Sequence, residues 1–258
     1  VLNYFEMPDI YSDFYLLQDV PHGTIRMDYY KSSVTGRIRN CFVYTPPGYE
    51  EHPEKRYPVW YLQHGGGEDE TGWIWQGKIN YILDNLLASG QCREMIVVMN
   101  CGYAFFPDGS GHHSRGQIGD VLVKDCIPFI DKKYRTLPHR RARAMSGLSM
   151  GGFQSQSTVF QYPEYFASVG LFSSNFIVKN EEDDYTELLS DPKAFNELFD
   201  LCFVSWGDQE DMKASNGPLL SSLREKGFRI VSYVTPGYHE WAVWRYSARE
   251  FAKLLFRK

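Results

Sequence analysis

The sequence predicts an α/β fold with a mostly parallel central sheet of about eight strands and helices on both faces. Short runs rich in β-branched and aromatic residues alternate with helical patterns from the third run onward, as in parallel strands joined by helices. Several of these runs are almost entirely apolar, which is typical of strands covered on both faces. The 258 residues contain no repeat, low-complexity tract or Pro/Ser-rich linker, so one large domain is the simplest organisation.

Eight segments have the length and composition of strands. They cover Ile25–Tyr30, Asn40–Thr45, Val59–Gln63, Met95–Asn100, Ala142–Ser146, Ser168–Phe172, Cys202–Ser205 and Ile230–Val234. Because no helical segment separates the first two, we expect them to pair antiparallel, as a hairpin at one edge of the sheet. Residues 1–20 are rich in Tyr, Asp and Phe and show no clear period, so we expect an extended N-terminal arm there and a single domain over residues 21–258.

The clearest helical pattern runs from Gln117 to Tyr134, where apolar residues recur on one broad stripe. We expect further helices over Lys78–Leu87, Gly151–Phe160, Asp191–Glu197, Pro218–Lys226 and Ala242–Phe256. Each lies between two expected strands or after the last one, which is the arrangement that a parallel sheet with crossover helices requires.

The composition excludes several classes of protein. Lys and Arg number 27 against 32 Asp and Glu, a net charge of −5, and no basic stripe is present, so we expect no nucleic-acid partner. No apolar run approaches the ~20 residues of a membrane-spanning helix, so we expect no membrane segment. The five cysteines are scattered and include no C-x-x-C pair, which argues against a zinc knuckle or a disulfide scaffold. Neither localisation nor oligomeric state is indicated.

A nucleophile motif, G-x-S-x-G, lies in the segment Gly147-Leu148-Ser149-Met150-Gly151-Gly152. The segment follows an expected strand and opens an expected helix, where this pattern makes a tight turn that pushes the serine hydroxyl out to solvent. The helix N-terminus also offers N–H groups to a developing anion. We therefore predict that Ser149 is a nucleophile, the alternative being a chance match to a short pattern.

A second motif, Gln63-His64-Gly65-Gly66-Gly67, ends the third expected strand. A glycine run lets the backbone approach a substrate closely and leaves its N–H groups free to donate. Where a nucleophile turn is present, this loop supplies half of the oxyanion hole, so we predict the N–H groups of Gly66 and Met150 as the donors. The alternative is an ordinary glycine-rich turn. We expect His64, at the strand end, to be structural.

The general base must come from another loop. Of seven histidines, only His239 follows the last expected strand, where the chain order serine, acid, histidine places the base. His52 and His139 lie in charged, proline-containing turns and are expected to be solvated. The pair His112-His113 could suggest a metal site, but it has no third partner at metal spacing, so we expect no metal.

The third member of a triad should be a carboxylate after the penultimate strand, where it would accept a hydrogen bond from the histidine. Asp208, Glu210 and Asp211 crowd that loop. Either Asp or Glu can fill the role in hydrolases of this kind, so the residues alone leave three candidates.

These segments together resemble the esterases of carbohydrate esterase family 1, the esterase-D-like group that contains feruloyl and acetylxylan esterases. The resemblance is carried by HGGG, GLSMGG and GYHEWAVWR, with DVPHGTIR and VYTPPGYE before them, and extends from about Asp19 to Phe256. It implies an α/β-hydrolase fold and ester hydrolysis through an acyl-enzyme, with Ser149 as nucleophile and His239 as base. It implies no metal or organic cofactor.

The chain departs from that family at the acid. Family members usually show Gly-x-x-Asp after the penultimate strand, with the Asp as the triad acid, whereas the matching position after Gly207 is Glu210. A shift of the loop by one residue would place Asp211 in the role instead. We predict Glu210 as the acid, with Asp211 and then Asp208 as alternatives.

Aromatic residues gather in the loops at the expected catalytic edge, at Trp73, Trp75, Tyr103, Phe105, Phe106, Tyr238, Trp241 and Trp244. Such rings can stack on a hydroxycinnamoyl group or a sugar, although packing among the loops would use the same residues. We predict that Trp73 and Trp241 bind the substrate.

We expect that substrate to be a ferulate-type ester on plant cell-wall polysaccharide, which would make the protein secreted or periplasmic. The alternatives are acetylxylan esterase, then S-formylglutathione or siderophore-ester hydrolase, sugar acyltransferase, and a catalytically silent binding module of the same fold.

Overall fold

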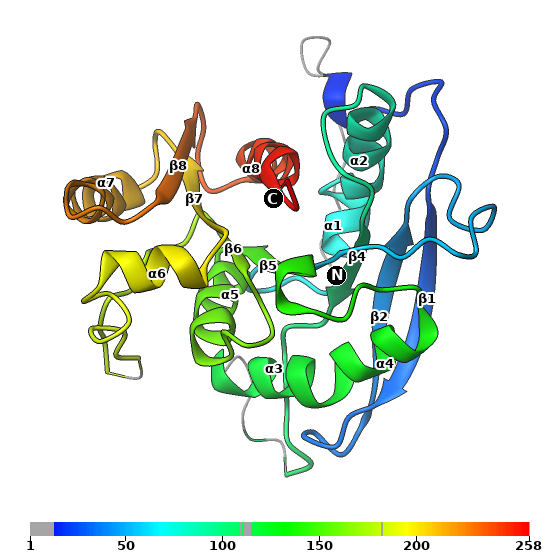
Figure 1. Cartoon of the computed structure of the whole chain (residues 1–258), viewed down its shortest axis with the longest axis horizontal. Coiled ribbons are helices and arrows are strands. Elements are labelled where there is room, and N and C mark those ends of the chain that lie inside the picture. The colour runs from blue at the N-terminus through cyan, green and yellow to red at the C-terminus, as the bar shows by residue number, and fades with distance from the viewer. Residues whose placement is uncertain (1–12, 109, 111–114, 182, 258) are drawn as a thin grey trace.

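Eight strands form one sheet in the computed structural model, which describes residues 13–108, 110, 115–181 and 183–257 (Figure 1). In chain order they are β1 (Thr24–Lys31), β2 (Ile38–Thr45), β3 (Val59–Gln63), β4 (Ile96–Asn100), β5 (Arg143–Leu148), β6 (Ser168–Phe172), β7 (Leu201–Gly207) and β8 (Ile230–Thr235). Every predicted strand is confirmed, with ends that differ by at most two residues.

The order across the sheet is β1-β2-β4-β3-β5-β6-β7-β8. As predicted, β1 pairs antiparallel with β2 at one edge, and β2 pairs antiparallel with β4. All pairs from β4 to β8 are parallel. The carboxyl ends of β3 to β8 therefore meet at one edge of the sheet, which is where α/β proteins place their sites.

The helices are α1 (Gly72–Trp75), α2 (Ile79–Ala88), α3 (Arg115–Val121), α4 (Ile127–Lys133), α5 (Met150–Gln161), α6 (Pro192–Leu198), α7 (Met212–Glu225) and α8 (Trp241–Leu254). Short 3-10 turns cover Asp13–Tyr15 and Arg140–Ala142. Two expectations need correction. The helix predicted over Gln117–Tyr134 is divided by a π-helical segment at Leu122–Cys126, next to Pro128, which has no N–H to donate to the preceding turn.

The second correction concerns α7, which begins at Met212 and carries Pro218 inside it rather than at its start. The first turns of α7 are fixed from outside the helix by the buried Asn216. Its side chain accepts from the Phe176 N–H at 2.9 Å and donates to the Ser174 carbonyl at 3.0 Å. These tertiary bonds offset the hydrogen bond that a proline removes from a helix interior.

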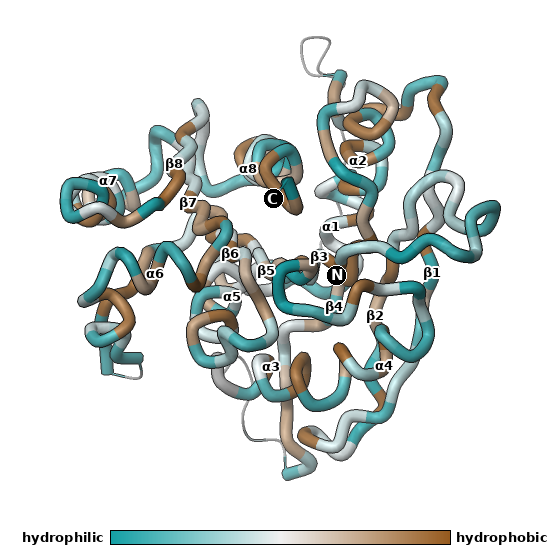
Figure 2. Tube along the Cα trace, viewed as in Figure 1, coloured by the Kyte–Doolittle hydropathy of each residue, from teal (hydrophilic) through white to brown (hydrophobic). Residues whose placement is uncertain are grey.

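The core has two parts, one on each face of the sheet. Along β3, Val59 and Tyr61 point into a cluster with α3 to α7, whereas Trp60 and Leu62 point into a cluster with α1, α2 and α8, as the two-residue period of a strand requires. Figure 2 shows brown, apolar stretches on the inner strands, while the peripheral loops are largely teal. Helices thus cover both faces, as predicted.

Of the predicted N-terminal arm, residues 1–12 lie outside the described residues. Asp13–Tyr15 forms a 3-10 turn, and Tyr15 is buried in the cluster that contains α2 and α8. Within the ranges that the structure describes, no helix is both long and apolar enough to cross a bilayer.

Candidate active site

The candidate site lies at the carboxyl ends of the parallel strands, where backbone hydrogen bonds join neighbouring loops. The Ser149 N–H after β5 donates to the Phe172 carbonyl of β6 at 2.8 Å. The Ser173 N–H after β6 donates to the Ser205 carbonyl of β7 at 2.7 Å. The loops after β7 and β8 are joined by the Gln209 N–H, which donates to the Gly237 carbonyl at 3.1 Å. These bonds fix the predicted serine, acid and histidine loops relative to one another.

Ser149 occupies the tight turn between β5 and α5, with φ 51° and ψ −115°. A non-glycine residue at positive φ is strained by roughly 1–3 kcal/mol. Close backbone packing sets the turn: a Cβ on Gly147 would lie 2.6 Å from Gly151, and a Cβ on Gly151 would lie 2.5 Å from the His64 carbonyl. Both glycines of the motif are therefore required, and they bring the serine turn directly against the loop after β3.

His239 and Glu210 are hydrogen bonded, with 2.9 Å between Nδ1 and Oε2. Because an ionised carboxylate only accepts hydrogen bonds, Nδ1 carries a proton, and in the neutral ring Nε2 therefore keeps its lone pair. This is the tautomer that a general base requires. The His239 side chain is 44% exposed, whereas that of Glu210 is 3% exposed, so the base faces solvent and its partner is enclosed.

Glu210 accepts two further hydrogen bonds from inside the fold. The Ser173 hydroxyl donates to Oε1 at 2.6 Å, and the Gly207 N–H donates to the same oxygen at 2.7 Å. Burial by itself raises the pKa of Glu210, but the hydrogen bonds from His239, Ser173 and Gly207 outweigh it and hold that pKa below its ordinary value. The network thus keeps the carboxylate ionised.

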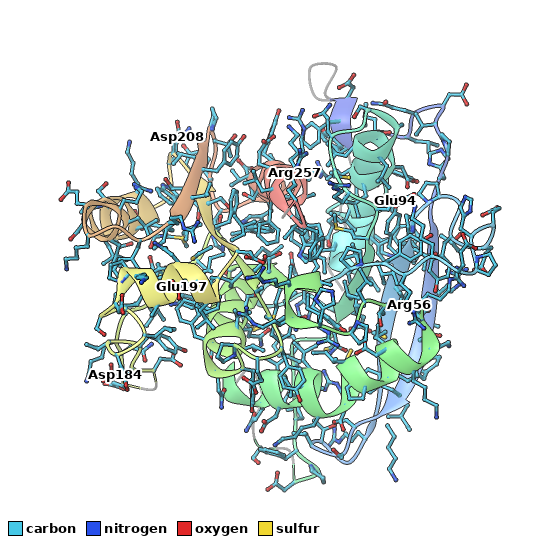
Figure 3. All side chains as sticks on the ribbon, viewed as in Figure 1. Arg56, Glu94, Asp184, Glu197, Asp208 and Arg257 are labelled. Atoms are coloured by element: carbon cyan, nitrogen blue, oxygen red, sulfur yellow. The ribbon has the colours of Figure 1, made fainter. Side chains whose placement is uncertain are left out.

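The two other candidate acids point elsewhere. Asp208, labelled beside β8 in Figure 3, is exposed and accepts from the Gly237 N–H at 3.0 Å. Asp211 is exposed and precedes α7. Of the three carboxylates in this loop, Glu210 is the one that contacts His239.

Gly66 lies between two glycines whose N–H groups are already used. The Gly65 N–H donates to the Glu68 carboxylate at 2.9 Å, and the Gly67 N–H donates to the Tyr103 hydroxyl at 2.6 Å. The Gly66 N–H has no acceptor among the residues that the structure describes. Met150 is the first residue of α5, so its N–H has no acceptor within the helix. Both predicted oxyanion donors thus remain available for a ligand.

His64 is structural, as predicted. It is 1% exposed, its Nε2 accepts from the Gly102 N–H at 2.8 Å, and its Nδ1 lies 2.8 Å from the Gly65 carbonyl. Nε2 can accept only in the tautomer that carries its proton on Nδ1, so Nδ1 donates to Gly65. Burial lowers the pKa of His64, which keeps the ring neutral in this bridge between two loops.

Two supporting residues, Ser173 and Glu68, have no role in the sequence prediction, and Tyr103 enters it only as one of the loop aromatics. Ser173 is buried with φ 48° and reaches Glu210 from 37 residues away along the chain. Tyr103 bonds the glycine loop from a separation of 36 residues. No spacing rule links such positions. Glu68 could have been predicted from the sequence. It follows the glycine run directly, where a carboxylate can accept a hydrogen bond from an N–H group of the loop.

The two predicted substrate-binding tryptophans differ in position. Trp73 is 1% exposed and donates its indole N–H to the Gln63 carbonyl at 2.8 Å, so the structure places it in the core rather than in a substrate pocket. Trp241, at the start of α8, is half-buried. It packs edge-on against Trp73 and Trp244, with ring centroids 5.1 and 5.2 Å apart.

Neither the predicted site nor its surroundings gathers metal ligands. Over the described residues, no group of three or more His, Cys, Asp or Glu side chains could hold a metal ion. The pair His112-His113 lies outside those residues. The candidate site consists of Ser149, His239, Glu210 and the backbone N–H groups of Gly66 and Met150.

A family model of esterases, described as "Putative esterase", matches residues 32–248. That range covers most of the chain, so the chain belongs to this esterase family. Both the serine turn and the histidine loop fall within the matched range.

Among curated relatives, the endo-1,4-beta-xylanase/feruloyl esterase of Xylanibacter ruminicola is 37% identical over 98% of this chain. The chain spans 34% of that relative's length. It therefore corresponds to one part of a longer protein in that organism.

Two solved structures share the fold. A CE1 ferulic acid esterase from Anaeromyces mucronatus, in complex with ferulic acid, is 24% identical with a TM-score of 0.80, over 97% of this chain and 96% of that one. The feruloyl esterase module from Clostridium thermocellum, complexed with sinapinate, is 23% identical with a TM-score of 0.79, over 99% and 94%. The predicted α/β-hydrolase fold is confirmed.

Proposed function

We propose that this chain is a serine esterase that hydrolyses hydroxycinnamate esters, of the ferulate type, carried on plant cell-wall polysaccharide. The observation that carries the proposal is the hydrogen bond from His239 to the buried Glu210, at the edge of the sheet where Ser149 occupies its strained turn. Serine, glutamate and histidine follow one another in the chain order of hydrolases with such a turn.

In the first half of the reaction, Ser149 Oγ attacks the ester carbonyl carbon while His239 Nε2 takes the hydroxyl proton. Glu210 stays ionised and stabilises the imidazolium. The carbonyl oxygen gains negative charge, which the N–H groups of Gly66 and Met150 stabilise more strongly than they would the neutral ester. His239 then gives its proton to the oxygen of the leaving alcohol, and the acyl group remains on Ser149.

In the second half, a water molecule attacks the acyl-enzyme carbonyl and His239 Nε2 takes its proton. The same two N–H groups hold the second oxyanion. When the bond to Ser149 breaks, His239 returns the proton to Oγ, and the carboxylic acid leaves. The polysaccharide and the hydroxycinnamic acid are thus released in separate steps, with no cofactor.

The choice of acyl group is supported by the aromatic surroundings and by the names of the relatives. Tyr103 and Phe105 stack with ring centroids 6.2 Å apart, and the Tyr103 hydroxyl reaches the loop that carries Gly66. Trp241, at the start of α8, is half-buried and therefore partly accessible. Aromatic side chains favour a planar acyl group through offset or edge-on contacts.

Initial rates on methyl ferulate, acetylated xylan and S-formylglutathione test the proposal, with Ser149→Ala as the blank. We expect methyl ferulate to give the highest kcat/KM and Ser149→Ala to abolish turnover with the fold intact. Dominance of acetylated xylan would make the protein an acetylxylan esterase instead. Turnover that survives Ser149→Ala would overturn the assignment of the nucleophile.

A further inference from the structure

The edge of the sheet opposite the candidate active site carries three adjoining hollows. The largest, of about 520 Å³, is lined by residues that precede three strands, Pro58 before β3, Arg93 before β4 and Arg141 before β5, and by Phe256 after α8. Smaller hollows of about 300 and 240 Å³ adjoin it. The five residues of β3 span about 16 Å, so a ligand in these hollows would lie at the far end of the strands from the Ser149 turn.

Three arginines lie where the hollows adjoin. Arg93 lines the largest hollow and the one of about 300 Å³, Arg141 lines the largest and the one of about 240 Å³, and Arg257 lines the two smaller ones. Arg257, labelled in Figure 3, belongs to the segment that follows α8. Each pair of hollows thus shares one arginine, and the three hollows together form one extended concave surface.

The charges of Arg93 and Arg257 meet no carboxylate among the residues that the structure describes, since neither side chain forms an ion pair there. Arg257 donates instead to the carbonyl oxygens of Lys253 and Gln91. These neutral acceptors fix the guanidinium group and leave its positive charge in place. The whole chain has a net charge of −5, so the positive charge of this surface is opposite to that of the protein.

The carboxylates that line the hollows compensate the arginines only weakly. Glu94, in the largest hollow, forms an ion pair with Lys55. Asp200 lines the hollow of about 240 Å³, and its Oδ2 lies 3.9 Å from Arg141 Nε, beyond hydrogen-bond distance. The Arg141 side chain is 64% exposed. The arginines therefore keep N–H donors for an anionic ligand.

Apolar surface lies beside these arginines. Pro58, Leu137 and Phe256 are partly buried and line the largest hollow. A planar guanidinium group binds a carboxylate through two parallel N–H···O bonds, and an apolar wall packs against the ring that carries the carboxylate. The surface therefore suits a carboxylate on a ring-shaped body, and its extension over three hollows favours a chain of such rings over a single small acid.

We propose that this surface is a second binding site, which takes a segment of polysaccharide that bears uronic acid carboxylates. The choice of ligand rests on the function proposed above, since uronic acids carry the negative charge of plant cell-wall polysaccharides. Arg93, Arg141 and Arg257 bind the carboxylates, and a sugar ring packs against Phe256. Because the site lies at the opposite edge from Ser149, it holds the enzyme on the polysaccharide and raises the effective concentration of further esters.

Isothermal titration calorimetry tests this with two xylo-oligosaccharides of equal length, one neutral and one carrying glucuronic acid. The protein is Ser149→Ala, so that hydrolysis contributes no heat. In that background, Arg93→Gln and Arg141→Gln, singly and together, remove the charges of two exposed side chains. Arg37→Gln is the matched control: Arg37 is exposed between β1 and β2 and donates to the Phe106 carbonyl, beyond the carboxyl end of β4, at 3.4 Å.

We expect the acidic oligosaccharide to bind about tenfold more tightly than the neutral one, as a hydrogen bond to a charged group allows. Each single variant should weaken its binding about fivefold, and the double variant should abolish the difference between the two oligosaccharides. Arg37→Gln should change either Kd by less than about twofold. Added NaCl should weaken the binding of the acidic ligand alone, because salt screens exposed charges.

Equal affinity for the two oligosaccharides would overturn the proposal, as would a preference for the acidic one that survives the double variant. Free ferulate serves as a third ligand. If it binds with the same dependence on Arg93 and Arg141 while the acidic oligosaccharide does not bind, the site takes the released acid and the proposal is wrong.

Chemical-shift mapping by NMR on the Ser149→Ala protein needs no further variant. The acidic oligosaccharide should shift the backbone amides of residues 92–94, 139–142 and 256–257, and shifts confined to the loops of Ser149 and His239 would contradict the proposal. Wild-type protein that hydrolyses no ester would refute the proposed function, whereas calorimetry and NMR would still decide whether this surface binds an acidic polysaccharide.

Discussion

The two halves of the site are held by different chemistry. On the histidine side, a buried ion is the centre: Glu210 accepts from a histidine, a hydroxyl and a backbone N–H. On the oxyanion side, the centre is a neutral ring, His64, which joins the N–H of Gly102 to the carbonyl of Gly65. The bonds on the histidine side keep the Glu210 carboxylate ionised and next to His239. The bonds on the oxyanion side fix the orientation of the peptide group that joins Gly65 to Gly66.

The backbone argument depends on the planarity of the peptide bond. The Gly65 carbonyl and the Gly66 N–H belong to one peptide unit, so they point in opposite directions in one plane. When His64 fixes the carbonyl, it also fixes the N–H that we propose as an oxyanion donor. We therefore expect the two sides to be sensitive to different substitutions. The histidine side should lose activity when the charge of Glu210 is removed, and the oxyanion side when the hydrogen bonds of His64 are removed.

Glu210→Gln would break the charged half, and we expect it to have the largest effect. The NH₂ group of the new amide would face His239 Nδ1, because the amide oxygen is needed by Ser173 and Gly207. The ring would then carry its proton on Nε2 instead of Nδ1, and it would have no carboxylate to stabilise its charged form. The equivalent change in a serine protease triad costs about 10⁴ in kcat. We expect a loss of about 10³- to 10⁴-fold, measured as steady-state kcat on methyl ferulate.

Asp211→Asn is the control for that change, because Asp211 is an exposed carboxylate in the same loop. It should alter kcat by less than about twofold. A larger loss in Asp211→Asn than in Glu210→Gln would mean that the loop shifts in solution and that Asp211 is the acid.

His64→Ala would break the neutral half. The Gly66 N–H would lose its orientation, and we expect kcat to fall about 10²-fold with little change in KM, near the lower range for loss of an oxyanion donor. The buried Gly102 N–H would also lose its acceptor, at a cost of about 1–3 kcal/mol in the free energy of unfolding. Kinetics and urea unfolding measure the two effects, with the exposed His52→Ala as control. Lost stability with normal kcat would mean that His64 stabilises the fold without orienting the Gly66 N–H.

Most of the fold could be predicted from the sequence because its strands are short apolar runs with a helical segment between them. The exceptions lie where tertiary contacts or proline decide. The helix α7 begins at Met212 rather than at Pro218, because the buried Asn216 bonds a neighbouring loop. The sequence around Asn216 does not predict these bonds, because their partners lie about 40 residues away in the chain.

The residues of the candidate site also fall into those that local motifs predict and those that only tertiary contacts bring together. Ser149, His239 and Glu210 follow from motifs and chain order, which are local properties of the sequence. Ser173 and Tyr103 reach the site over separations of 37 and 36 residues, so only the folded chain shows that they support it. Trp73 illustrates the converse, since its place in the sequence suggested a pocket, yet it is buried.

Ser173→Ala tests how much one hydrogen bond contributes on the histidine side. It removes the bond from the Ser173 hydroxyl to Glu210 but leaves the carboxylate in place. A hydrogen bond to a charged group contributes about 1.5–3 kcal/mol, and we expect that loss in the free energy of unfolding at pH 7, with a decrease of kcat of about threefold. Ser174→Ala is a matched control: the Ser174 hydroxyl is also buried, but no hydrogen-bond partner for it exists among the described residues. Its removal should cost less than about 0.5 kcal/mol.

The effect of Ser173→Ala should depend on pH. The hydrogen bonds hold the pKa of Glu210 below its ordinary value, so their stabilisation is present above the unfolded pKa, about 4.3, and is lost as the pH falls through the folded pKa. The difference in stability between wild type and Ser173→Ala should therefore shrink below about pH 4. A difference that is equal at pH 7 and pH 3.5 would mean that Ser173 acts through its unusual backbone geometry rather than through Glu210.

Trp241→Phe addresses the predicted substrate contact, and we expect the smallest effect from it. Phe keeps an aromatic ring against Trp73 and Trp244 but is smaller than the indole and has no N–H. If Trp241 contacts the acyl group, kcat/KM should fall about threefold for methyl ferulate, since an aromatic contact contributes about 0.5–1.5 kcal/mol, and change little for an acetyl ester. Both esters use the same serine, acid and histidine, so their ratio separates contact with the acyl group from damage to the triad. An equal loss on both esters would mean that Trp241 supports the site through its packing on Trp73 and Trp244 and contacts no acyl group.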